Sequence, residues 1–100
     1  MAIVEFTVAP FGTGTPSLSK YVAGVQKVVE EQAGEIKYML TPMGTILEGD
    51  LDEILALIRR AHEVPFTAGA LRVSTQIKID DRRDKQATME GKIKSVREKM

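Results

Sequence analysis

The chain has 100 residues, and its 14 Lys and Arg balance its 14 Asp and Glu, so the formal net charge is zero. This length predicts one domain with a modest core, and the balanced charge argues against broad capture of nucleic acid or of an acidic membrane. The absence of cysteine excludes disulfides, thiolate metal sites and a cysteine nucleophile. The N-terminal apolar run contains Glu5 and lacks a basic start, so we expect neither signal peptide nor membrane span, and a cytoplasmic protein.

The first third of the chain predicts a strand, a loop and a helix. Residues 2–10, AIVEFTVAP, are rich in β-branched and aromatic side chains and predict a strand. The Gly-rich stretch FGTGTPS follows as a loop. From Leu18 onward apolar residues recur at helical spacing, which predicts a helix capped by Thr15 or Ser17 and stopped by Gly34.

The middle of the chain predicts a β-hairpin. Two short strands, at 35–40 and 44–48, flank the turn residues Thr41, Pro42 and Met43. We expect Gly44 to take a positive φ, which glycine adopts without steric cost.

A second helix and a last strand follow the hairpin. Asp50 with Glu53 forms a variant of the capping box, in which the aspartate accepts from the backbone amide of the third helical residue. The helix behind it carries an apolar stripe, and we expect Pro65 to end it. The segment LRVSTQIKID then alternates strictly between apolar and polar residues and predicts a strand at 71–80.

The order of these elements, β-α-β-β-α-β, predicts an α+β, ferredoxin-like antiparallel sandwich. Two right-handed crossovers place both helices on one face of a four-stranded sheet and leave the other face uncovered. We expect that open face to carry polar side chains from the last and first strands, namely Arg72, Ser74, Gln76, Lys78, Glu5 and Thr7. A mixed polar face of this kind meets either water or another subunit.

The C-terminal part is a charged linker and a helix at 82–100, after a βαββαβ core at 1–81, within a single domain. Met89, Ile93, Val96 and Met100 form a narrow apolar stripe on this helix. Because a lone helix of this length is marginal in water, we expect it to dock on its own domain or on a neighbouring subunit.

Three features suggest sites, and for each a structural interpretation is the stronger one. The turn PFGTGTPS exposes amides at a helix N-terminus, where anions bind, but it lacks the third glycine of a dinucleotide site and the GK[ST] of a P-loop. His62 is the only histidine and has no partner for a zinc triad. Asp80, Asp81 and Asp84 suggest magnesium, yet the interleaved Arg and Lys residues favour ion pairs. The sequence thus predicts no catalytic group, metal or cofactor, and we expect no enzyme.

Three motifs together resemble a known family. PFGTGTPSLSKYV, YMLTPMGTILEGDLDE and RVSTQIKIDDRRDK, in this order and spacing and continuing through TMEGKIKSV, closely resemble the thiamine-binding protein family of small ferredoxin-like domains. The resemblance covers nearly the whole chain. It implies a homo-oligomer in which sheet-mediated dimers pair into tetramers, and a small-molecule ligand, because some relatives bind thiamine or its hydroxymethylpyrimidine half.

The resemblance also suggests a ligand slot between the Gly-rich loop and the hairpin. An aminopyrimidine needs an acceptor, a donor and an apolar plane. Glu48 is the expected acceptor, and the expected ligand-binding residues are Thr7, Phe11, Gly12, Thr13, Gly14, Ser17, Met43, Thr45 and Glu48. Alternation along a regular strand places Thr45 and Glu48 on opposite faces, so either a bulge intervenes or only one of them contributes.

The function that we expect is binding of thiamine or hydroxymethylpyrimidine without chemistry, as a carrier, buffer or sensor. Two alternatives remain: an oligomeric regulatory or scaffolding protein that binds another metabolite or a protein partner, and a metal-assisted enzyme built on the three aspartates.

Overall fold

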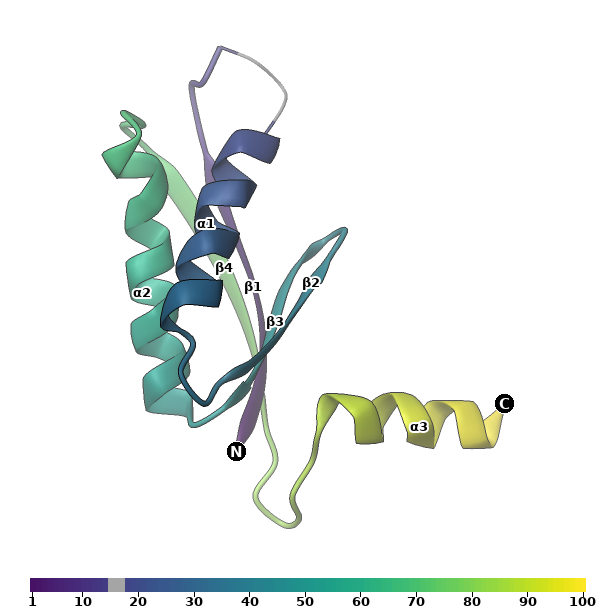
Figure 1. The fold of residues 1–100 in the computed structure, drawn as a ribbon. Helices are drawn as coiled ribbons and strands as arrows, with labels where there is room; N and C mark the ends of the chain where they lie inside the picture. The colour runs from purple at the N-terminus through teal and green to yellow at the C-terminus, as the bar shows by residue number, and fades with distance from the viewer. Residues whose placement is uncertain (15–17) are drawn as a thin grey trace.

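The fold is a four-stranded antiparallel sheet with two helices on one face and a third helix beyond it (Figure 1). The structure, a computed structural model, describes residues 1–14 and 18–100. The strands lie in the order β2-β3-β1-β4. The elements are β1 (Ala2–Pro10), α1 (Ser19–Gln32), β2 (Lys37–Thr41), β3 (Gly44–Gly49), α2 (Leu51–Thr67), β4 (Val73–Asp81) and α3 (Met89–Lys99). The predicted ferredoxin-like α+β fold is confirmed.

Alternation along β1 separates the two faces of the sheet. Val4, Phe6 and Val8 point toward the helices and are buried in the core. Helices α1 and α2 close that core with an apolar stripe each, formed by Val25, Val29, Ile54, Leu57, Ile58 and Ala61. Burying these side chains is the main favourable term in the stability of the fold.

The opposite face of the sheet carries the predicted polar side chains along β1 and β4, together with apolar Ile3, Ile46 and Met39. Glu5 pairs with Lys78 and Thr7 pairs with Gln76 across β1 and β4, so their side chains share the face without α1 and α2. The last strand begins at Val73, so Arg72 lies just before β4 and not within it. Its guanidinium lies 4.9 Å from the centroid of the Phe11 ring.

The helix signals act largely as the sequence predicts. Gly34 has φ 59° just beyond the end of α1, and the Asp50 carboxylate accepts from the Glu53 amide at 3.1 Å. The prediction that Pro65 ends the second helix is wrong, because α2 continues through it to Thr67. Pro65 falls in the last turn, where it removes a single hydrogen bond, and its ring is fully buried.

Helix α3 extends away from the body of the domain, as Figure 1 shows at the yellow end of the chain. The Thr88 hydroxyl caps it by accepting from the Gly91 amide at 2.9 Å. Only Met89 of its apolar stripe is buried; Ile93 is 47% exposed and Val96 61% exposed. The radius of gyration, 14.7 Å, exceeds the roughly 13 Å of a compact domain of this length. Within this chain, therefore, only the first turn of α3 docks.

No helix in the described part of the chain is long and apolar enough to cross a membrane.

Candidate functional site

A cavity of about 210 Å³ lies where β1 continues beyond the end of β3. Pairing between these strands stops at Phe6 and Thr45, whereas β1 remains paired with β4 as far as Pro10. The β2–β3 hairpin splays away from β1 at this level, and the start of α1 lies above the gap (Figure 1). The cavity is lined by Phe6, Thr7, Val8, Ala9, Leu18, Val22, Val25, Leu40, Thr41, Pro42, Met43, Gly44 and Thr45.

The hairpin approaches β1 closely because Gly44 has no side chain. A Cβ on this residue would lie 2.9 Å from the Phe6 carbonyl oxygen and 2.9 Å from Thr7 Cγ2. The φ of Gly44 is 158°, nearly extended, so close approach explains the glycine better than the positive φ of a turn. Thr41 completes the turn, since its hydroxyl donates to the Gly44 carbonyl at 2.8 Å and accepts from the Met43 amide at 3.3 Å.

Thr45 is the buried polar side chain of this cavity. It is 5% exposed, pairs with Phe6 and points to the helix-facing side of the sheet. Its hydroxyl has no hydrogen-bond partner among the described residues. The hydroxyl is not completely buried, because the completely buried side-chain atom without a partner in the described part of the chain is Gln26 Oε1. The Thr45 hydroxyl therefore remains accessible from the cavity that Thr45 lines, and a ligand there can donate to it or accept from it.

The structure brings together only part of the predicted ligand-binding set. Thr7, Met43 and Thr45 line the cavity. Phe11, Gly12 and Thr13 instead line a separate, shallower hollow beside the loop that follows α2. Gly14 lines neither, and Ser17 lies outside the described residues.

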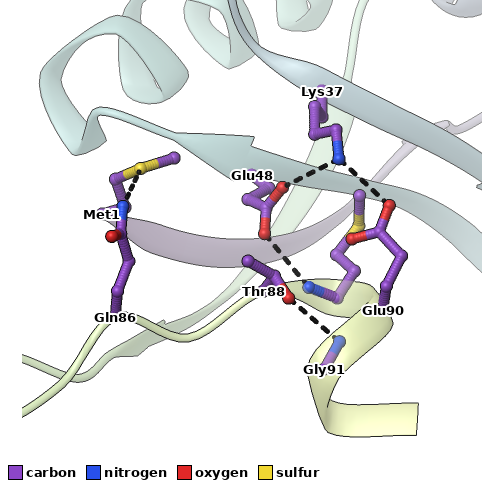
Figure 2. Close-up of polar contacts among 8 residues, drawn as sticks. Met1, Lys37, Glu48, Gln86, Thr88, Glu90 and Gly91 are labelled. Atoms are coloured by element: carbon purple, nitrogen blue, oxygen red, sulfur yellow. Dashed lines mark hydrogen bonds and ion pairs between the residues drawn. The ribbon is translucent and has the colours of Figure 1, made fainter. Parts of the chain in front are cut away.

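Glu48 lies away from the cavity, on the opposite face of the sheet, where Figure 2 shows its contacts. Its side chain is buried and faces the start of α3. Oε1 accepts from the Met89 amide at 3.1 Å, and Oε2 lies 3.9 Å from Lys37 Nζ. The strand is regular, so no bulge turns Glu48 toward Thr45. The carboxylate attaches α3 to the sheet and does not line the cavity, so the prediction that Glu48 lies in the same slot as Thr45 is wrong.

Lys37 links two carboxylates at the same place. Its ammonium lies 3.1 Å from Glu90 Oε1, on the first turn of α3 (Figure 2). The hydrogen bond to Glu90 raises the pKa of Lys37 above its ordinary value. The pKa of Glu90 is lowered by a backbone hydrogen bond and then by Lys37. We call Lys37, Glu48, Met89 and Glu90 the α3 anchor.

The aspartates after β4 form ion pairs. The Arg82 guanidinium donates to Asp84 at 2.6 and 2.9 Å, and this hydrogen bond lowers the pKa of Asp84 to about 2. Arg83 donates to Asp81 and lowers its pKa, while Lys92 pairs with Asp80. Within the described ranges, no three acidic or histidine side chains are grouped so as to hold a metal ion.

His62 makes contacts of the kind found in a folded core. A hydrogen bond of 2.6 Å joins its Nδ1 to the Thr75 hydroxyl on β4, and its ring meets Phe66 edge-on at 5.5 Å. The hydrogen bond joins α2 to β4, and the ring contact lies within α2 itself. These contacts agree with the structural role predicted for this residue.

Several cavity residues were missed by sequence reasoning. Val22 and Val25 belong to the apolar stripe of α1, and Leu18 precedes the helix directly. Periodicity alone cannot separate a cavity wall from core. The difference in length between the predicted strands was the signal in the sequence that could have located the cavity. The first strand has 9 residues and the strands of the hairpin have 5 and 6, so part of the long strand must lack a neighbour on one side.

Comparison with known proteins gives close relatives over nearly the whole chain. Residues 4–97 match the family described as thiamine-binding protein. The UPF0045 protein YqgV of Bacillus subtilis is 55% identical over 98 residues, which cover 96% of this chain and 94% of that protein.

Solved structures agree with the fold. The MJ1052 protein of Methanocaldococcus jannaschii has a TM-score of 0.85 and 39% identity, covering 97% of this chain and 96% of that one. A Thermotoga maritima protein, provisionally described as a thiamine biosynthesis or salvage protein, has a TM-score of 0.75 and covers 95% of this chain and 97% of that one. Its identity is 21%, so this similarity shows the fold alone.

Proposed function

Because the chain belongs to the thiamine-binding protein family, we propose that its cavity binds the pyrimidine ring of thiamine or free hydroxymethylpyrimidine. Binding occurs without chemistry, and the protein acts as a carrier, buffer or sensor of this ligand in the cytoplasm. The description of the Thermotoga maritima protein, which has the same fold, is in keeping with a role in thiamine metabolism.

The size of the cavity favours one ring over two. Its volume of about 210 Å³ is below the range of about 300–1,000 Å³ that is usual for drug-sized ligands. A pyrimidine ring fits such a space between the apolar side chains of α1 and the hairpin. In thiamine, the cationic thiazolium would then lie outside, beside Met43, which is exposed at the rim.

The observation that carries the proposal is the Thr45 hydroxyl, which lines the cavity and has no hydrogen-bond partner among the described residues. In an otherwise apolar cavity, one such group orients a ring that carries polar atoms at its edge. The ring supplies the hydrogen bond that the hydroxyl lacks, and its faces pack against apolar side chains.

The lining of the cavity also supports binding without catalysis. Among the described residues that form it, none has a side chain that titrates near neutral pH. General acid–base or nucleophilic catalysis requires such a group within hydrogen-bonding distance of the substrate.

The proposal is tested by calorimetric titration of thiamine, hydroxymethylpyrimidine and the thiazole half into the wild-type protein and into Thr45→Val. We expect thiamine and the pyrimidine to bind and the thiazole not to bind. Thr45→Val keeps the shape and removes the hydroxyl, so it should weaken pyrimidine binding by about 1 kcal/mol, roughly fivefold, without lowering the free energy of unfolding. Thr45→Ser, which keeps the hydroxyl, is the matched control. Failure of the wild-type protein to bind either pyrimidine compound would refute the proposal.

A second candidate function rests on α3. Its exposed stripe of Ile93 and Val96 favours an oligomeric regulatory or scaffolding protein that presents this helix to a partner. The two functions are compatible in one molecule. We propose a homo-oligomer, a dimer of dimers, as the form in which the ligand is bound.

A further inference from the structure

The strand β1 has a free edge inside the cavity. The Phe6 carbonyl points toward β3, because it lies 2.9 Å from the position that a Cβ on Gly44 would take. Backbone groups of alternate residues point to the same side of a strand, so the N–H and C=O of Val8 face the same way. At Val8, however, β3 has ended, and no backbone partner for it is found on that side among the described residues.

Two further observations agree that the N–H and C=O of Val8 point away from β4. The Phe11 amide donates to the Arg72 carbonyl at 2.9 Å, so odd-numbered residues of this segment point to the β4 side and even-numbered ones away from it. Pro10, which has no N–H, occupies an even-numbered position although it is paired in register with Val73. Proline is tolerated in strands where its nitrogen faces an unpaired edge, as it does here.

Val8 therefore presents one donor and one acceptor, side by side, to the cavity that it lines. We propose that the backbone of Val8 recognises the ligand by two hydrogen bonds. Its N–H donates to a ring nitrogen, and its C=O accepts from an amino group on the adjacent ring carbon. This inference rests on the proposed function and specifies its ligand class, planar heterocycles with an amidine-like edge, of which a 4-aminopyrimidine is one. The ring takes the place in the sheet that β3 leaves empty, as an added strand does in β-augmentation.

The surroundings of Val8 suit a ring in this plane. Leu18, which directly precedes α1, and Val22 on α1 would cover one face of the ring, and Met43 lies at the tip of the hairpin beside it. The Thr45 hydroxyl is on the neighbouring strand, close to the last pair of the β1–β3 ladder. A ring without the amino group or without the adjacent ring nitrogen would leave one backbone group of Val8 without a partner, and it should bind more weakly for that reason.

The test compares Val8→Pro with Val8→Ala by calorimetry. Val8→Pro removes the N–H that faces the cavity and leaves the hydrogen bonds between β1 and β4 intact. Val8→Ala also changes the side chain but keeps the N–H, so it is the matched control. We expect hydroxymethylpyrimidine to bind Val8→Pro roughly tenfold more weakly than Val8→Ala. The pyridine analogue, which has C–H in place of the ring nitrogen next to the amino group, should bind both variants alike.

Nuclear magnetic resonance of the wild-type protein gives a second measurement that does not depend on the folding of Val8→Pro. The Val8 amide proton should shift downfield on titration with hydroxymethylpyrimidine, and should shift much less with the pyridine analogue. Equal affinity of the two variants, or an unmoved Val8 amide in a saturated complex, overturns this inference and leaves the proposed function standing. Absence of any pyrimidine binding to the wild-type protein overturns both.

Discussion

A buried carboxylate is costly unless it has partners, and the partners of Glu48 lie on α3 and β2. Its side chain is 2% exposed, and it accepts from the Met89 amide while Lys37 lies nearby. Removing a charge of this kind leaves its partners unsatisfied, which costs more than the contact itself contributes. Glu48 is therefore a residue on which the position of a whole helix depends.

We predict that Glu48→Gln loosens α3 without weakening the binding of hydroxymethylpyrimidine. The amide can still accept from Met89 but cannot balance Lys37, so the free energy of unfolding should fall by about 1–3 kcal/mol. Urea unfolding measures this loss, limited proteolysis after residue 85 reports on α3, and calorimetry reports on the ligand.

Glu90→Gln is the matched control for this prediction, because it removes the exposed partner of the same lysine. It should change stability little, as exposed ion pairs usually do. If Glu48→Gln instead reduced affinity for the pyrimidine and left α3 in place, Glu48 would be a ligand group after all.

At the scale of residues, the sequence predicts which types of side chain line the cavity better than it predicts where unpaired backbone groups lie. It names Thr45 and Met43 as candidates, and both line the cavity, while period-2 alternation correctly separates Thr45 from Glu48. It does not identify Val8, because the relevant groups of Val8 belong to the backbone and are the same in every residue except proline. Only the register of β1 against β3 shows that they are unpaired.

At the scale of elements, local signals determine most boundaries. Gly34 and Asp50 act in the structure as they do in isolated helices, through a left-handed conformation and a side-chain cap. Pro65 does not, because packing of its buried ring outweighs the local cost of proline in a helix. The end of a helix is predictable from sequence where no tertiary contact competes with the local signal.

Helix α3 should depend on pH through its anchor. The pKa of Glu90 is lowered in the folded protein, so its contribution to docking is present above the ordinary carboxyl pKa, near 4.5, and is lost as the pH falls through the lowered value. Asp84, with its pKa of about 2, adds a similar contribution in the preceding linker. Because each of these ion pairs is exposed and contributes little, we predict only a small loss of protection from hydrogen exchange at the amides of α3 between about pH 4.5 and pH 2, and none over this range at those of β1.

Nuclear magnetic resonance across this range would measure the effect residue by residue. In Glu90→Gln part of the pH dependence should disappear, since one titrating group has been removed. Simultaneous loss of protection in α3 and β1 would contradict the prediction, because it would mean that the helix and the sheet unfold as one unit.

At the scale of the whole molecule, the chain holds more apolar surface than one copy can bury. Beyond α3, six exposed apolar residues lie on the hairpin and on the edge strand β4, and they are Tyr38, Met39, Leu40, Met43, Ile77 and Ile79. A chain of this size has little core to spare. Contact between copies is the arrangement that would bury this surface, and the sequence alone gives no geometry for it.

We predict that the wild-type protein has the mass of a tetramer in solution and that the double variant Ile93→Glu, Val96→Glu does not. Two carboxylates on the apolar stripe would be buried without partners in an interface, which association cannot tolerate. Light scattering after size-exclusion chromatography measures the mass. Ser95→Glu, which adds charge on the other side of α3, should remain assembled; loss of assembly in that variant too would indicate a nonspecific effect of charge.

The close contact at Gly44 has a consequence for how sequences of this kind can diverge. The hairpin can lie this close to β1 because residue 44 has no Cβ, which would lie 2.9 Å from the Phe6 carbonyl oxygen. Side chains around the cavity can therefore be exchanged one at a time, altering its polarity or contour, while the opening keeps its width. Selectivity for a ligand can therefore change by single substitutions in the lining. A side chain at residue 44 would instead push the hairpin away from β1 and widen the opening.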